Sequence, residues 1–221
     1  MRTRPDLRLY ALLDPAQSDR ALEALARQTA EGGATLFQLR DKESSTRALV
    51  ARARAVQEAL APFGRRLLVN DRVDVALAAG AAGVHVGQED LSPEDARRLL
   101  GPDAIIGLTV HSVEEAEAAP VDLLDYVGVG GIFATVSKAN PNPPIGPGGL
   151  TRIAGVLRRR APDLPICAIA GITAENTASV IRAGAGGVAV ISALSKAADP
   201  AAAARRLRAA VDGALGPGTG P

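Results

Sequence analysis

The chain is poor in the residues that several classes of protein depend on. Its 221 residues include no tryptophan, three phenylalanines, two tyrosines and one cysteine. So few aromatic side chains argue against a surface on which nucleic-acid bases stack. The single cysteine, Cys167, excludes an intramolecular disulfide. Its apolar neighbours predict a small buried side chain rather than a nucleophile.

An excess of charge and long apolar runs are also missing. The chain has 25 basic and 24 acidic residues, a formal net charge of +1 and no long basic run, which argues against nucleic acid as a partner. The first apolar run, 9–13, is too short for the core of a signal peptide. No run approaches the ~18 apolar residues that a membrane span needs. We therefore expect a cytoplasmic protein with no membrane partner.

Short apolar runs alternate with amphipathic helical patterns along the whole chain. The runs predict eight strands, at residues 9–13, 35–39, 67–69, 83–86, 105–110, 126–132, 165–169 and 187–191. Four helix starts carry local signals, and one of them is at Thr173, shortly after Gly171. Ser92 and Asp199 each stand before a proline, and Ser112 and Glu115 predict a capping box in which each side chain satisfies a free backbone N–H.

Eight strand–helix units predict an α/β fold, a single (β/α)8 TIM barrel. Residues 81–86 (AAGVHV) resemble residues 185–190 (AGGVAV), four units further on. The alternative, an open doubly wound sheet, usually has fewer strands and a single glycine-rich phosphate turn. We expect residues 7–213 to form a catalytic barrel, after an N-terminal extension at 1–6 and before a disordered tail at 214–221.

Two aspartates follow neighbouring predicted strands, at the barrel end where active sites lie. Asp71 comes after the third strand and Asp90 after the fourth. Neighbouring strands are about 4.8 Å apart, so the two carboxylates could share one Mg²⁺ that a substrate phosphate completes. Either aspartate alone could instead cap the following helix, but this explanation is weaker for the pair.

Cationic and polar residues follow the second strand. Strand alternation places Gln38 and Arg40 on one side, and Lys42 continues that side into the loop. An amide and two cations suit an anionic substrate. The alternative is a solvated loop with a surface ion pair.

Further candidates for anion binding follow strands six, seven and eight. Thr135, Ser137 and Lys138 offer two hydroxyls and a cation, although a polar surface loop has the same composition. Gly171 and Ser192 follow the last two strands, a frequent phosphate site of this fold. Gly171 could instead serve only a tight turn.

The two histidines have different predicted roles. His111 follows strand five and is a candidate general base, whereas His85 lies within strand four and is predicted to be packed or hydrogen-bonded. The proline-rich stretch 140–149 is predicted to be an active-site loop. The sequence leaves open whether it closes over substrate.

Five strings together resemble the thiamine phosphate synthase family. They are QLRDK at 38–42, NDRVD at 70–74, GVHVGQED at 83–90, YVGVG at 126–130 and GIT at 171–173. The resemblance runs from about residue 9 to residue 194. It implies a transferase of thiamine biosynthesis that joins 4-amino-2-methyl-5-(diphosphooxymethyl)pyrimidine to a thiazole phosphate. It also implies a dissociative, Mg²⁺-assisted mechanism, in which pyrophosphate leaves first and the thiazole nitrogen traps a pyrimidine carbocation.

The resemblance also implies a role for each matching residue. Contacts to the pyrimidine pyrophosphate are expected from Gln38, Arg40, Lys42, Asn70, Thr109 and Lys138. Contacts to the thiazole phosphate are expected from Thr135, Ser137, Gly171, Ile191 and Ser192. Asp71 and Asp90 are expected to hold Mg²⁺. Arg40, Lys42 and Lys138 are the predicted catalytic groups, because cations placed where charge develops stabilise a leaving pyrophosphate.

Some positions depart from the family's usual pattern. Gly131 and Ala134 stand where the family often has proline, and Ala170 stands where it often has glycine. Ser137 stands where threonine is common, and Thr109 stands where serine is common. Both exchanges keep a hydroxyl group at the position.

Two other functions stay open at this point. A thiazole tautomerase of the same barrel family would use His111 as acid or base and would not need the metal pair. A non-catalytic phosphate-binding barrel would keep Gly171 and Ser192 but has no need of two carboxylates. The sequence leaves open the oligomeric state, a homo-oligomer included, and the preferred thiazole phosphate tautomer.

Overall fold

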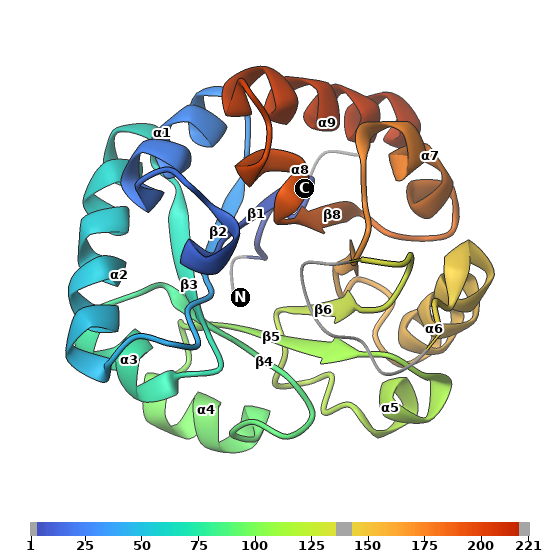
Figure 1. The fold of residues 1–221 in the computed structure, drawn as a ribbon. Coiled ribbons are helices and arrows are strands. Elements are labelled where there is room, and N and C mark those ends of the chain that lie inside the picture. The colour runs from blue at the N-terminus through green and yellow to red at the C-terminus, as the bar shows by residue number, and fades with distance from the viewer. Residues whose placement is uncertain (1–3, 136–142, 217–221) are drawn as a thin grey trace.

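The computed structural model describes residues 4–135 and 143–216, and its strands close into a parallel barrel ringed by helices (Figure 1). The strands are β1 (Leu9–Leu13), β2 (Leu36–Leu39), β3 (Arg66–Asn70), β4 (Gly83–Val86), β5 (Ile105–Val110), β6 (Tyr126–Val129), β7 (Ile166–Ile169) and β8 (Gly187–Val190). The helices are α1 (Leu22–Glu31), α2 (Thr46–Leu60), α3 (Val73–Ala79), α4 (Pro93–Leu100), α5 (Val113–Ala118), α6 (Gly146–Arg160), α7 (Ala174–Arg182), α8 (Ser192–Ser195) and α9 (Pro200–Leu215), with 3₁₀ turns at Pro15–Gln17 and Ala61–Phe63. The predicted TIM barrel is confirmed.

Alternation along each strand separates two apolar layers. In β1, Leu9 and Leu13 pack between the barrel and its helices, whereas Tyr10 and Leu12 point into the barrel. The interior cluster consists of Leu7, Tyr10, Leu12, Leu36, Leu68, Ile105, Tyr126, Cys167 and Ala189. Cys167 is fully buried, as predicted, and burial raises the pKa of its thiol.

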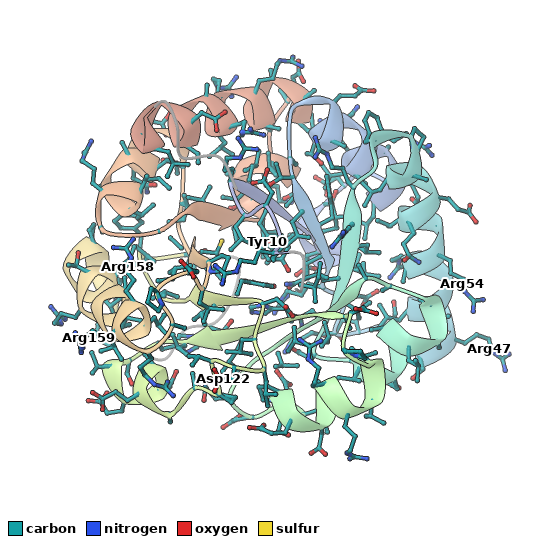
Figure 2. All side chains as sticks on the ribbon, turned by 180° about the vertical axis from the view of Figure 1, so that it is seen from behind. Tyr10, Arg47, Arg54, Asp122, Arg158 and Arg159 are labelled. Atoms are coloured by element: carbon teal, nitrogen blue, oxygen red, sulfur yellow. The ribbon has the colours of Figure 1, made fainter. Side chains whose placement is uncertain are left out.

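Charged side chains lie on the outer surface of the helix ring. Figure 2 shows Arg47, Arg54 and Arg159 projecting away from the barrel, while Tyr10 lies within it. Within residues 4–135 and 143–216, no helix combines the length and apolar character that a membrane crossing needs.

Three of the four predicted helix starts, at Ser92, Thr173 and Asp199, are confirmed, and the fourth is partly wrong. Ser92 accepts from the N–H of Asp95, and Asp199 accepts from that of Ala202. Ser112 likewise accepts from the N–H of Glu115 at 3.2 Å. The Glu115 carboxylate, however, accepts from the N–H of His111 at 2.7 Å. The same oxygen lies 3.4 Å from His111 Nδ1. The carboxylate therefore lies beside the histidine and bonds the N–H of residue 111, where the capping box predicts the N–H of Ser112.

Four predicted strands change by one residue at one or both ends, and two predicted boundaries change by more. β6 ends at Val129 instead of continuing to 132, because the chain turns at Gly131, whose φ is +71°. The predicted loop at 140–149 is shorter than expected, since α6 begins at Gly146 with Pro147 in its first turn. Residues 140–142 of that stretch lie outside the described part of the chain.

Candidate active site

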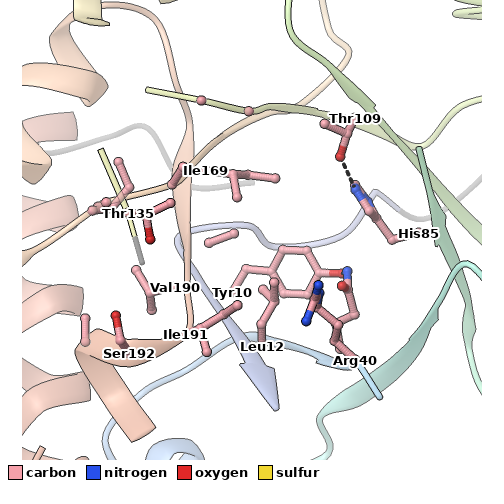
Figure 3. Close-up of a pocket in the computed structure, with 18 of the residues that line it drawn as sticks. Tyr10, Leu12, Arg40, His85, Thr109, Thr135, Ile169, Val190, Ile191 and Ser192 are labelled. Atoms are coloured by element: carbon pink, nitrogen blue, oxygen red, sulfur yellow. Dashed lines mark hydrogen bonds between the residues drawn. The ribbon is translucent and has the colours of Figure 1, made fainter. Parts of the chain in front are cut away.

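A cavity of about 610 Å³ opens where the strands end (Figure 3). Eight of the predicted site residues line it: Gln38, Arg40, Asn70, Thr109, Thr135, Gly171, Ile191 and Ser192. Ser137 and Lys138 lie outside the described residues. The location agrees with the general rule for this fold, since each of these eight residues lies in the C-terminal half of a strand or follows a strand.

The floor of the cavity is polar and buried. Gln38 Nε2 lies 2.5 Å from the Tyr10 hydroxyl, which lies 2.9 Å from the Tyr126 hydroxyl. The Tyr126 hydroxyl is 2.7 Å from His85 Nδ1, and His85 Nε2 is 2.6 Å from Thr109 Oγ1 (Figure 3). Burial raises the pKa of both tyrosines, so both hydroxyls keep their protons. The prediction that His85 is packed and hydrogen-bonded is confirmed.

Arg40 is held at the cavity wall by a buried partner. Its guanidinium pairs with the carboxylate of Asp14, whose side chain is only 3% exposed. Asp14 also accepts from the N–H of Ala16 at 2.9 Å, which fixes the carboxylate in turn. Because Asp14 is buried and Arg40 is largely covered, the alternative of a solvated surface pair does not describe Arg40. A pre-oriented guanidinium suits the bidentate binding of phosphate oxygens.

The two predicted metal ligands lie together just beyond the end of β3. Asp71 follows Asn70, and its N–H donates to the carbonyl oxygen of His85 at 2.8 Å. Its φ of +60° is a conformation that aspartate tolerates better than most residues. Burial, and then the neighbouring Asp90 carboxylate, raise the pKa of Asp71, while Lys42 Nζ at 3.2 Å from its carboxylate lowers it.

The two aspartates are not the caps of the helices that follow. Arg72 occupies the N-cap of α3, and Ser92 occupies that of α4. Asp90 instead accepts from the N–H of Gly87 at 2.7 Å within its own loop. The capping explanation of the two aspartates is therefore wrong.

The two carboxylates suit a Mg²⁺ ion that water and substrate complete, rather than a metal ion held by protein ligands alone. Within the part of the chain that the structure describes, no group of three or more His, Cys, Asp or Glu gathers around one point. Two close carboxylates repel each other, and a hard cation between them would relieve that repulsion. Mg²⁺ commonly uses one or two carboxylates and fills its other positions with water and substrate phosphate. Asp71 and Asp90 could hold such an ion at the rim of the cavity.

The opposite wall offers small residues and hydroxyls. Figure 3 shows Thr135 and Ser192 on one side of the cavity, away from Arg40. Gly171 has a φ of +65°, and a Cβ there would lie 2.5 Å from the carbonyl oxygen of Ala134. Glycine is therefore required at 171 both by conformation and by close approach, so its tight-turn interpretation and its place in the cavity are compatible.

His111 also lines the cavity, beside Gly130. A Cβ at Gly130 would lie 2.7 Å from His111 Nε2, so the glycine makes room for the ring. The Glu115 carboxylate holds the other edge of the ring. The catalytic role of His111 stays a hypothesis.

Sequence reasoning missed several lining residues. Tyr10, Leu12, Ile169 and Val190 line the cavity, and Tyr126 lies beneath it. A tyrosine at an inward-facing position of the first predicted strand was the available signal for Tyr10.

Comparison with known proteins decides the family. A family model described as thiamine monophosphate synthase matches residues 9–194. The chain belongs to this family. The span equals the one over which the sequence motifs resemble thiamine phosphate synthase, and that resemblance is confirmed.

Relatives of the thiamine monophosphate synthase family match over nearly their whole length. The thiamine-phosphate synthase of Agrobacterium fabrum is 50% identical over 211 residues, covering 95% of this chain and 96% of its own. That of Moorella thermoacetica is 51% identical over 192 residues, covering 87% and 89%. The solved thiamine phosphate pyrophosphorylase of Pyrococcus furiosus superposes with a TM-score of 0.83 at 35% identity, covering 96% of this chain and 99% of its own.

Proposed function

We propose that this member of the thiamine monophosphate synthase family condenses 4-amino-2-methyl-5-(diphosphooxymethyl)pyrimidine with a thiazole phosphate. The products are thiamine phosphate and pyrophosphate. The observation that carries the proposal is the grouping of Lys42, Asp71 and Asp90 close to the cavity that Gln38, Arg40 and Asn70 line. This arrangement suits a pyrophosphate at the rim and an uncharged ring below it.

The leaving group accounts for most of the charged residues. Asp71 and Asp90 would hold Mg²⁺, which supplies positive charge to the departing pyrophosphate when it is bound. Arg40, Lys42 and Lys138 would add three cations around the same oxygens. Fixed positive charges of this kind stabilise the charge that develops as the bond breaks.

Bond breaking precedes bond making in the proposed reaction. The carbon–oxygen bond between the pyrimidine methylene and pyrophosphate breaks, and the electron pair leaves with the oxygen. The lone pair of the thiazole nitrogen then forms the new carbon–nitrogen bond. The chain needs no nucleophile for either step, and proximity of the two substrates supplies much of the remaining acceleration.

Two sets of residues would hold the substrates. Gln38, Asn70 and Thr109 would contact the pyrimidine substrate below its pyrophosphate. Thr135, Ser137, Gly171, Ile191 and Ser192 would bind the thiazole phosphate on the opposite wall. Apolar side chains such as Leu12 and Ile169 line the space between, where they would limit the access of water to a reactive cation.

The decisive experiment supplies purified protein with both substrates and Mg²⁺ and measures thiamine phosphate by chromatography. We expect product with the wild type, and little product in excess chelator or with an Asp71→Ala/Asp90→Ala double variant. No product from the wild type, or full activity in the double variant, contradicts the proposal. The cytoplasmic location and the N-terminal limit of the barrel at residue 7 stay predictions. The expected start of a disordered tail at 214 is wrong, because α9 continues to Leu215 and both Ala214 and Leu215 pack against the core.

A further inference from the structure

Five side chains form one continuous hydrogen-bonded chain across the barrel interior. They come from five different strands, in the order Gln38, Tyr10, Tyr126, His85 and Thr109. Only the ends, Gln38 and Thr109, belong to the residues expected to contact substrate. The three middle members have no role in the reaction proposed above, and the direction of their hydrogen bonds decides what they can do for the two ends.

Chemistry fixes the direction of the first two bonds. The amide nitrogen Gln38 Nε2 can only donate, so the Tyr10 oxygen accepts. Tyr10 is fully buried and must place its own proton, and its other partner is the Tyr126 oxygen at 2.9 Å. Tyr126 is fully buried too, and its remaining partner is His85 Nδ1 at 2.7 Å. Each hydroxyl therefore donates to the next residue along the chain.

His85 continues the same direction of hydrogen-bond donation to Thr109, which lines the cavity. A ring that accepts at Nδ1 and is neutral carries its proton on Nε2, and so it donates to Thr109 Oγ1 at 2.6 Å. Within residues 4–135 and 143–216, the structure gives that hydroxyl no other hydrogen bond. We infer that His85 is a positioning residue, which turns the Thr109 hydroxyl into a hydrogen-bond donor for an acceptor atom of the bound pyrimidine substrate.

The surroundings hold the chain in this arrangement. The rings of His85 and Tyr126 stack with centroids 5.4 Å apart and an interplanar angle of 26°. A Cβ at Gly107 would lie 2.1 Å from Tyr126 Cζ, and one at Gly128 would lie 3.3 Å from His85 Cε1. The two glycines therefore leave the space that the rings occupy, since a Cβ at Gly107 would displace Tyr126 and one at Gly128 would crowd His85.

The opposite direction makes a different, measurable prediction. If the Gln38 amide were reversed, its oxygen would accept from Tyr10 and every proton would move to the other side of its bond. His85 would then carry its proton on Nδ1 and accept from Thr109. The hydroxyl could only accept from the substrate. The tautomer of His85 thus separates the two directions.

The first test measures that tautomer directly. The chain has two histidines, so ¹⁵N-histidine labelling gives two rings, and a His111→Gln variant assigns them. Long-range ¹H–¹⁵N spectra of the protein without substrate should show a neutral His85 ring protonated on Nε2. A ring protonated on Nδ1, or a charged ring, overturns the inference. No substrate is involved, so this result is independent of the proposed function.

The second test asks whether His85 acts through Thr109, and it rests on the proposed function. Calorimetry with Mg²⁺ would measure binding of the pyrimidine pyrophosphate to Thr109→Val, Thr109→Ser, His85→Phe and the His85→Phe/Thr109→Val double variant. We expect Thr109→Val to weaken binding about 10-fold and Thr109→Ser to restore most of it.

His85→Phe should also weaken binding, but it should add little in the Thr109→Val background. Independent effects in the double variant would mean that His85 has a merely structural role, and they overturn the inference. A wild-type protein that does not bind this ligand refutes the proposed function instead, and the spectra then decide the direction of the chain alone.

Discussion

The backbone N–H of Asp71 donates to the carbonyl oxygen of His85 at 2.8 Å. This bond continues the β3–β4 pairing one residue beyond the Asn70–His85 pair and holds Asp71 at its positive φ. The main chain of His85 thus supports the loop that carries Asp71, while its ring joins Tyr126 to Thr109 in the buried hydrogen-bonded chain. One residue of β4 couples the expected pyrophosphate end of the cavity to its floor.

Replacing Asp71 by asparagine should separate activity from stability. Asparagine accepts a positive φ and keeps the side-chain shape, but it removes one carboxylate from the proposed Mg²⁺ site. We expect the rate of thiamine phosphate formation to fall on the order of 10²-fold, the range seen when one stabilising group is lost. Steady-state kinetics at saturating Mg²⁺ measures this, and an unchanged rate contradicts the role of Asp71.

The same variant should have a distinctive pH dependence of stability without metal. Burial and Asp90 raise the folded-state pKa of Asp71, so the wild type loses stability relative to Asp71→Asn as the pH rises through that pKa. Asp74→Asn is the matched control. The hydrogen bond from Arg72 lowers the pKa of Asp74, so the small stability that its carboxylate contributes is lost as the pH falls. Urea denaturation across pH should therefore show opposite trends for the two variants.

Asp14→Asn should weaken the hold on Arg40 without removing a helix cap. The asparagine oxygen can still accept from Ala16, but the buried charge partner of Arg40 is gone. We expect the KM for the pyrimidine pyrophosphate to rise about 5- to 10-fold, because a charge-assisted bond that orients the guanidinium is worth about 1–2 kcal/mol. Asp125→Asn breaks a comparable buried pair with Arg97 at the other end of the barrel. It should lower stability and leave KM unchanged; equal KM effects in both variants would contradict the positioning of Arg40.

The charged residues around the site could be predicted from the sequence, because active-site residues of this fold follow the C-terminal ends of the strands. Gln38, Arg40, Asp71 and Asp90 all stand where an apolar run stops, and parallel strands bring such positions to one end of a barrel. No contact across the barrel was needed for that prediction.

The floor of the cavity could not be predicted in the same way. Alternation indicates that Tyr10 and Tyr126 both point inward, but how deep each ring lies depends on strand tilt and on which opposite positions lack a side chain. Gly107 decides this for Tyr126, and its effect appears only when β5 and β6 are placed together. The His111–Glu115 contact was missed for a similar reason: a capping box describes the backbone, whereas the ring of a neighbouring residue redirected the carboxylate.

Ala170→Gly should stabilise the protein. Ala170 has a φ of +88°, a conformation that costs a residue with a Cβ about 1–2 kcal/mol. Glycine removes this cost but loses about 0.5–1 kcal/mol of chain entropy, so the expected net gain is up to about 1 kcal/mol. This corresponds to an increase in Tm of about 2–4 °C for a chain of this size. Ala168→Gly, in β7 nearby, has no positive φ to relieve and should lower Tm; a lower Tm for both variants would contradict the explanation.

Gly107→Ala tests whether the Tyr126 ring needs the space that the missing side chain leaves in β5. The added Cβ would lie 2.1 Å from Tyr126 Cζ, so the ring must move, at an expected cost of about 3 kcal/mol in the free energy of unfolding. Gly155→Ala is the control, because a Cβ in α6 meets only the end of Arg159 at 3.7 Å and should raise stability by up to about 1 kcal/mol.

The clash at Gly107 should depend on the size of the residue at 126. Tyr126→Leu costs stability by itself, since it leaves a cavity and removes the hydrogen bond between the Tyr126 hydroxyl and His85 Nδ1. In the Gly107→Ala/Tyr126→Leu double variant, however, the new methyl group fills part of that cavity. The double variant should therefore lose less free energy of unfolding than the sum of the two single losses, by at least about 1 kcal/mol, because residues in contact couple. Chemical denaturation of the four proteins gives the coupling energy directly. A coupling near zero would mean that Gly107 does not set the depth of the Tyr126 ring, and that the chain from Gln38 to Thr109 is held by its hydrogen bonds alone.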